Sequence, residues 1–226
     1  MLFRSALTAL AGSPFPVGAT PAMAKMDPMG KYLYVASAQS NNVSAFVVDA
    51  STGALAAVPG SPFTTGTDPT GLAIDPTGQY VYVANDVSST VTAFKIDPAS
   101  GALTSIAGSP YGSTNPLALA IDGTGKYLYV ANHYASNNVS AYSIDPSSGA
   151  LTPVAGSPFT AGVGPNDIEV DFSGKFVYVA NAESGLVGDV SVFGIDPANG
   201  SLSQVGGSPF AAGYVPGSVV TTGQIQ

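Results

Sequence analysis

The sequence predicts an all-β protein, a β-propeller of four-stranded antiparallel blades, and two repeating patterns lead to that prediction. The first is a short segment whose four copies are MDPMGKYLYVAS from Met26, IDPTGQYVYVAN from Ile74, IDGTGKYLYVAN from Ile121 and VDFSGKFVYVAN from Val170. The second is a Ser-Pro-aromatic motif that begins at Ser13, Ser61, Ser109, Ser157 and Ser208. The spacing is 48 residues three times and then 51. Tandem repeats of this length are typical of propeller blades.

Each repeat contains four candidate strands joined by turn-forming residues. In the second repeat we predict strand A at 70–75, strand B at 79–84, strand C at 90–97 and strand D at 103–107. Strand B has apolar side chains on both faces, as expected for a blade packed between two neighbours. Strand D is predicted to be the outer edge, because one copy contains Pro153, which cannot donate to a ladder. The turn aspartates, Asp75 and Asp97 among them, are predicted to be structural.

A single domain is predicted over residues 1–226, with incomplete repeats at both ends. The full repeats occupy residues 21–63, 69–111, 116–159 and 165–210. A D-like strand over 5–11 precedes them, and an A-like strand over 217–222 follows. Because folded proteins avoid unpaired strand edges, we expect the two ends to form a reduced fifth blade that closes a five-bladed ring. The alternative is pairing of the terminal strands between chains, which gives a homo-oligomer or a filament.

The composition limits the partners that are expected. The chain has 14 acidic and 6 basic residues and a net charge of -8, whereas nucleic-acid and anionic-membrane surfaces need clustered Lys and Arg. No apolar run is long enough to insert into a membrane. The absence of cysteine excludes disulfides and thiolate sites. Residues 1–12 have the charge and apolar run of a short signal peptide, but residues 6–15 match 102–111, so we interpret them as a repeat strand.

The tandem YVAN strand, the IDP turn and the GSPF motif resemble the YVTN-type, lactonase-like propeller family, which includes 6-phosphogluconolactonase-like proteins. The resemblance covers nearly the whole chain. Two functions remain open. The first is a binding or scaffold module, which recognises a small polar ligand or a protein partner through its loop-bearing face and central channel. The alternative is a lactone hydrolase, in which a channel carboxylate or His133 activates water.

Departures from the repeat locate the candidate ligand site. The second and fourth residues after the proline that begins strand A are predicted to face the channel. They are small or uncharged in most repeats, but Lys25, Asp167 and Glu169 are charged. We expect these three to form the floor of a pocket beside the seam, with the long B–C loop of residues 181–190 on its rim. The candidate ligand-binding residues are Lys25, Asn166, Asp167, Glu169 and Glu183.

Catalytic and metal-binding roles rest on few side chains. His133, the only histidine, and Glu169 are the candidate bases for activating water. Asp68, Asp167 and Glu169 offer oxygens that suit a hard cation such as Ca²⁺ in the channel. The resemblance implies the same arrangement, since metal-dependent lactonase propellers hold a cation there with carboxylate and amide ligands. The alternative for these charged groups is a solvated channel wall or a structural ion pair.

Overall fold

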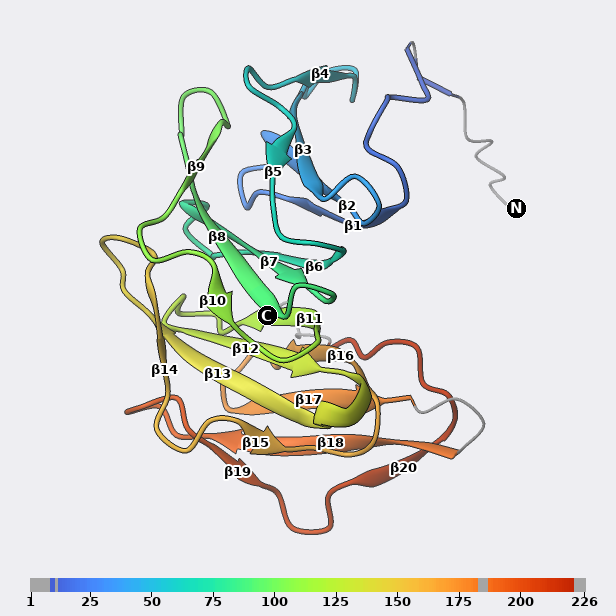
Figure 1. Ribbon diagram of the computed structural model, residues 1–226, viewed down its shortest axis with the longest axis vertical. Helices are drawn as coiled ribbons and strands as arrows, with labels where there is room; N and C mark the ends of the chain where they lie inside the picture. Colours follow the sequence, from blue (N-terminus) through green and yellow to red (C-terminus); the bar gives the residue numbers. More distant parts are fainter. Residues whose placement is uncertain (1–8, 11, 183–186, 222–226) are drawn as a thin grey trace, which may run out of the picture.

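The structure is a computed structural model that describes residues 9–10, 12–182 and 187–221, and these residues form four antiparallel sheets (Figure 1). In each sheet the inner strand pairs with the first of two middle strands, and the second middle strand pairs with an outer strand that is divided into two short pieces. We call the sheets blades one to four, in chain order. The described part of the chain has no helix with the length and apolar character of a membrane span.

The strands of the four blades have the following bounds. Blade one contains β1 (Pro21–Met26), β2 (Tyr32–Ser37), β3 (Asn42–Val48), β4 (Leu55–Ala57) and β5 (Phe63–Thr64). Blade two contains β6 (Pro69–Ile74), β7 (Tyr80–Asn85), β8 (Thr90–Ile96), β9 (Leu103–Ser105) and β10 (Tyr111–Gly112). Blade three contains β11 (Pro116–Ile121), β12 (Tyr127–Asn132), β13 (Asn138–Ile144), β14 (Leu151–Pro153) and β15 (Phe159–Thr160), with a 3₁₀ turn at Tyr134–Ser136. Blade four contains β16 (Pro165–Val170), β17 (Phe176–Asn181), β18 (Val187–Ile195), β19 (Leu202–Gln204) and β20 (Phe210–Tyr214).

The blades are arranged as a propeller, which confirms the predicted fold class. The inner strands β1, β6, β11 and β16 lie in a row around a common hub, each in contact with the next. The sheets radiate from this hub as a fan whose two ends are blades one and four (Figure 1). Strand A is therefore the hub strand in every blade, so side chains that deviate from its repeat pattern lie at the centre of the molecule.

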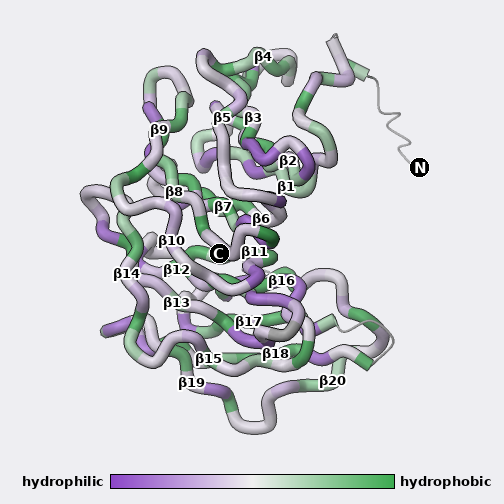
Figure 2. Tube along the Cα trace, viewed as in Figure 1, coloured by the Kyte–Doolittle hydropathy of each residue, from purple (hydrophilic) through white to green (hydrophobic). Residues whose placement is uncertain are grey.

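The hydrophobic core consists of three clusters, one at each junction between adjacent blades. In Figure 2 the hydrophobic segments accordingly concentrate in the strands near the hub, whereas the turns at the periphery are paler or hydrophilic. At the second junction, Tyr82 of β7 donates its hydroxyl proton to the Gly149 carbonyl of blade three at 2.8 Å. The ring of Tyr80 lies directly on the same glycine, where a Cβ would approach Tyr80 Cδ1 to 2.4 Å. The blades are therefore held together by apolar packing and by a hydrogen bond that needs glycine in the next blade.

The outer strand differs from its prediction. Strand D was expected as one strand over 103–107, but β9 ends at Ser105 and the chain returns to pair with β8 again as β10. Between the two pieces, Ser109 Oγ accepts the Ala93 N–H of β8 at 2.9 Å. This side-chain oxygen replaces the carbonyl that an uninterrupted ladder would supply. The Ser-Pro motif therefore marks a break inside the outer strand rather than its end.

The turn aspartates have the structural role that the sequence predicts. Asp75 is buried, and its carboxylate accepts the N–H groups of Gln79 at 2.7 Å and Tyr80 at 2.6 Å. Asp97 accepts N–H groups within its own C–D turn, and these bonds lower its pKa. Both side chains therefore close turns, as predicted.

The described residues that lie nearest to the two chain ends contact blade one and blade four. Most of the predicted leading strand, residues 1–8 and 11, lies outside the described residues, but Leu10 lies against Gly53 of blade one. At the other end a strand was predicted over 217–222, and residues 217–221 form no strand. They lie along β16, where Asn166 Nδ2 donates to the Gly217 carbonyl at 2.8 Å. The closing fifth blade therefore stays a prediction.

Candidate functional site

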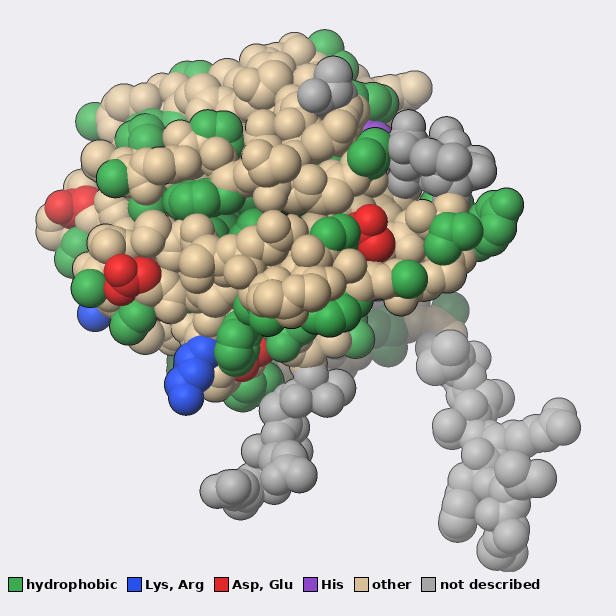
Figure 3. All heavy atoms as spheres, turned by 90° about the horizontal axis from the view of Figure 1, so that it is seen from below, with side chains coloured by type: hydrophobic (Ala, Val, Ile, Leu, Met, Phe, Trp, Pro, Cys, Tyr) green, Lys and Arg blue, Asp and Glu red, His purple; other side chains and the backbone are tan. Residues whose placement is uncertain are grey.

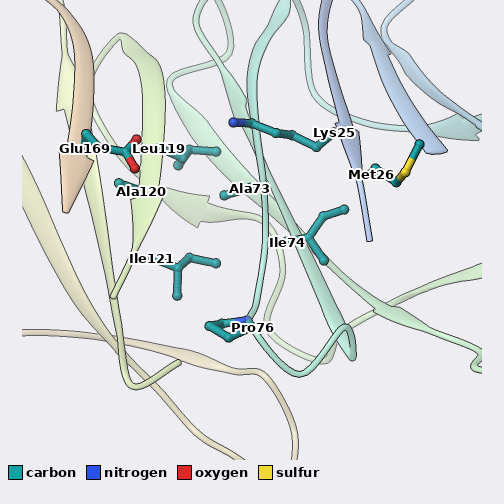
Figure 4. A pocket seen from close by; sticks show the side chains of 9 residues that line it. All are labelled: Lys25, Met26, Ala73, Ile74, Pro76, Leu119, Ala120, Ile121 and Glu169. Atoms are coloured by element: carbon teal, nitrogen blue, oxygen red, sulfur yellow. The ribbon is translucent and has the colours of Figure 1, made fainter. Parts of the chain in front are cut away.

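The channel contains a pocket of about 210 Å³ that is bounded by all four inner strands. Lys25 of β1 and Glu169 of β16 are its charged residues, and in Figure 4 the lysine side chain extends across the pocket towards the carboxylate. Alanines line the channel between them, because the same repeat position is alanine on β6 and β11. The other lining residues are apolar: Met26, Ala73, Ile74, Pro76, Leu119, Ala120 and Ile121. A cationic and an anionic group therefore face each other across the pocket, and most of the surface that the pocket exposes is polar.

The electrostatics of the pocket are set by the burial of Glu169. Burial is the main cause that raises the pKa of this half-buried carboxyl. The nearby charge of Lys25 opposes the rise, and that of Asp167 adds to it. A carboxyl with a raised pKa is a better proton acceptor than an ordinary exposed one, because a stronger conjugate base binds the proton more tightly. Glu169 is thus the channel group best suited to bind a hydroxyl or a water proton.

Asp167, which was predicted for the floor of the pocket, and the candidate ligand residue Asn166 lie elsewhere. Asp167 does not line the pocket; its Oδ2 accepts the Val219 N–H at 2.9 Å, and Asn166 binds the same terminal segment. Glu183 lies outside the described residues. Pro76, which lies in an A–B turn, lines the pocket. The pocket is therefore at the end of the channel that bears the A–B turns, and not at the end that bears the B–C loops. Of the five predicted ligand residues, the structure therefore brings two into the pocket.

A second cluster lies on the loop-bearing face, at the junction of blades two and three. Asp86 is 6% exposed, and its carboxylate is 3.5 Å from the Asn115 amide nitrogen. Burial raises the pKa of Asp86, and Asp68 adds to the rise, whereas Asn115 and His133 oppose it. His133 Nδ1 is itself buried without a hydrogen-bond partner in the described structure. His133 therefore faces an acidic loop cluster and does not share the channel pocket with Glu169.

The predicted cation ligands are not gathered into one site. Within residues 9–10, 12–182 and 187–221, no group of three or more His, Asp or Glu side chains is arranged to hold a metal ion. Asp68 belongs to the loop cluster, and Asp167 binds the terminal segment, so only Glu169 faces the pocket. We therefore derive no chemistry from Ca²⁺ at these residues.

Asp86 is the residue that sequence reasoning missed. It follows strand B directly, and the same repeat position is occupied by Ala38, His133 and Ala182 in the other blades. In each of blades two and three this residue donates its N–H to the residue that precedes strand A, at 2.9 Å in both cases. The sequence signal for this cluster was that Asp86 and His133 replace alanine at the same repeat position in two adjacent blades.

Comparison with protein families gives a match to the lactonase family of seven-bladed β-propellers over residues 8–114 and 109–219. The chain belongs to this family. Comparison with curated proteins gives no match. The described structure has four blades, fewer than the seven that define the family.

Solved structures with the same fold include proteins of different activities. A candidate 6-phosphogluconolactonase from Bacteroides uniformis is similar with a TM-score of 0.76 at 19% identity, over 86% of this chain and 56% of that one. The periplasmic gluconolactonase of Pseudomonas aeruginosa gives 0.69 at 24% identity, over 87% and 57%. Hydrazine synthase of Kuenenia stuttgartiensis gives 0.61 at 21%, over 88% and 53%. The chain thus spans little more than half of these structures, and the similarity shows the fold alone.

Proposed function

We propose that the channel pocket binds a small polar ligand with a single ring, of the sugar-lactone class. The observation that carries this proposal is the pair of Lys25 and Glu169 that face each other across the pocket. The ammonium group can donate to a ring or carbonyl oxygen, and the carboxylate can accept from hydroxyl groups. A pocket of about 210 Å³ is smaller than the roughly 300–1,000 Å³ typical of drug-sized ligand sites, which favours one ring.

The experiment is calorimetric titration with glucono-δ-lactone and with gluconate, its open acid. We expect binding of the lactone by the wild-type protein and at least tenfold weaker binding by Lys25→Met and Glu169→Gln. Lys95→Met removes one positive charge from an exposed position on β8 and serves as the matched control. Equal binding by all four proteins, or binding by none, would reject the pocket as the ligand site.

A second candidate function, lactone hydrolysis, is favoured by the raised pKa of Glu169. In this reaction Glu169 takes a proton from a water molecule as its oxygen attacks the lactone carbonyl carbon. Lys25 stabilises the developing oxyanion. The ring C–O bond then breaks, and the leaving alkoxide takes a proton to give the hydroxy acid. A pH-stat measures the acid that the protein releases from the lactone, after correction for spontaneous ring opening. Acid release that is lost in Glu169→Gln would support turnover. Lactone binding without acid release would instead support a binding module.

A further inference from the structure

The loop that leads into blade three is shorter than the loops that lead into the other blades. Each loop runs from the serine of a Ser-Pro motif to the proline that begins the next inner strand. Pro116 follows Ser109 by 7 residues, whereas the corresponding proline follows its serine by 8 residues in the other three loops. The residue that this loop lacks is a glycine, which is present elsewhere as Gly18, Gly66 and Gly162. The repeat pattern is therefore broken at the junction of blades two and three.

The missing glycine is one that packs closely against the last residue of strand B. A Cβ added to Gly66 would lie 2.9 Å from Asn85 Cβ, so in blade two the loop backbone fills the space beside the asparagine. In blade three the equivalent asparagine is Asn132, and the side chain of Ser113 contacts it instead. The serine hydroxyl donates to Asn132 Oδ1 at 2.8 Å. Because a serine side chain takes the place of a stretch of backbone, the shorter loop leaves space at this junction.

A pocket of about 380 Å³ lies at the junction of blades two and three, and we call it the junction pocket. Two asparagines line it, and no Lys, Arg, His, Asp or Glu of the described residues does. None of its lining residues also lines the channel pocket, so the two pockets are separate. Residues that bear hydroxyl groups provide more than half of the lining: Ser89, Ser113, Thr114, Ser140, Tyr142 and Ser157.

Two side chains of the junction pocket have hydrogen-bonding capacity that the described part of the protein leaves unused. Ser157 Oγ accepts the Ala141 N–H at 2.9 Å, and its hydroxyl can still donate. The Tyr142 hydroxyl donates to the Gly112 carbonyl across the junction, and its oxygen can still accept. The other three blades have phenylalanine at the position of Tyr142, namely Phe46, Phe94 and Phe193. A donor and an acceptor therefore line the pocket together, and the acceptor is specific to blade three.

We propose that the junction pocket binds an uncharged, hydroxyl-rich ligand of the saccharide class, with one or two rings. A sugar hydroxyl both donates and accepts, which matches the unused donor of Ser157 and the unused acceptor of Tyr142. Carbon atoms provide somewhat more of the pocket's exposed surface than polar atoms do, and they can cover the C–H face of a ring. The volume is near the lower end of the roughly 300–1,000 Å³ of ligand pockets, which suits one or two rings.

The uncharged lining separates this ligand from acidic or phosphorylated sugars. An anionic sugar would lose part of its hydration in the junction pocket and would gain no cationic partner among the lining residues. On the face of the molecule that Figure 3 shows, charged side chains are few and scattered among uncharged ones. The net charge of -8 also repels an anion at long range. The ligand that fits this pocket is therefore neutral, and the inference does not depend on what the channel pocket binds.

The test is titration of isotope-labelled protein with glucose, galactose and maltose, followed by NMR. We expect millimolar binding of at least one of these sugars, with shifts of the amide signals of Gly112 and Ser113, which line the pocket. The same sugar carrying a phosphate group should bind at least tenfold more weakly, because the pocket has no cationic side chain to receive the phosphate.

Two substitutions and a matched control locate the bound sugar. Ser157→Ala and Tyr142→Phe each remove one hydroxyl group from the pocket, and each should weaken binding about fivefold. Ser109→Ala is the control, because Ser109 Oγ accepts the Ala93 N–H at the same 2.9 Å but lies outside the pocket. The control should lose as much stability as Ser157→Ala and should bind the sugar as the wild type does.

Insertion of one glycine between Ser113 and Thr114 restores the loop length of the other blades, and we expect it to abolish binding. The proposal is overturned if none of the three sugars binds, or if Ser109→Ala weakens binding as much as Ser157→Ala does. Full binding by Tyr142→Phe and by the insertion variant would also overturn it. A loss of binding in Glu169→Gln would place the sugar in the channel pocket, with the same consequence. Failure here leaves the lactone titration of the channel pocket untouched, because that titration uses variants of other residues.

Discussion

The substitution Gly149→Ala tests whether glycine in the C–D turn is required by contact with the neighbouring blade as well as by backbone conformation. Gly149 has a φ of 72°, and an L-residue in the left-handed region costs roughly 1–2 kcal/mol. An added Cβ would also lie 2.4 Å from Tyr80 Cδ1 and 2.7 Å from Ile106 Cδ1. Overpacking of this kind costs roughly 1–3 kcal/mol. The free energy of unfolding should therefore fall by about 2–5 kcal/mol.

The control for this prediction is Gly174→Ala, which shares the positive φ but has open space at the Cβ position. It should lower the free energy of unfolding by only about 1–2 kcal/mol. Urea unfolding followed by tyrosine fluorescence and circular dichroism measures both variants on the same scale. Equal losses for the two substitutions would refute the argument, because the clash with Tyr80 would then contribute nothing.

Three further predictions concern single polar groups. Tyr82→Phe removes the bond to Gly149 and should cost about 1–3 kcal/mol in urea unfolding, whereas Tyr111→Phe, whose hydroxyl is exposed, should cost less than about 0.5 kcal/mol. Asp75→Asn replaces one acceptor oxygen by a donor and should cost about 1–3 kcal/mol by the same assay; an unchanged midpoint would contradict the turn role. Burial raises the pKa of Asp86 in the folded protein above its value in the unfolded chain. The contribution of Asp86 to the free energy of unfolding therefore falls as the pH rises from the unfolded pKa to the folded pKa. Asp86→Asn should therefore be more stable than wild type at neutral pH, with a difference that disappears towards pH 3; a constant difference would contradict the burial argument.

The fold was predictable because the same physical requirement recurs in every repeat. Apolar residues on both faces of strand B require a neighbouring sheet on each side, and the Asp-Pro and Gly turns limit the connections. The divided outer strand was not predicted, although an aromatic residue follows each Ser-Pro motif. Residues 217–221 lie beside β16 and contact it through the side chains of Asn166 and Asp167, and within the described residues they pair with no strand, so they form no ladder.

The candidate site was predictable in part, from departures in the repeat. Lys25 and Glu169 break the small-residue pattern of the inner strand, and they do face one pocket. Asp167 breaks the same pattern but binds the backbone of the terminal segment, which depends on how the end of the chain folds back. Asp86 was missed because its importance comes from its burial and from its neighbours in the next blade. Those neighbours are distant in the sequence.

The divided outer strand has a consequence for how such blades behave at high concentration and during folding. Blades one to three end at their rims in pieces of three residues and two residues, such as β9 and β10, separated by a proline with no N–H. A short, interrupted rim of this kind is a poor template for another sheet, so amyloid-like stacking of blade on blade through their rims is disfavoured. In blade four the second piece is β20, which is five residues long and exposed throughout. That rim is the one from which we expect aggregation to begin when the protein is stressed.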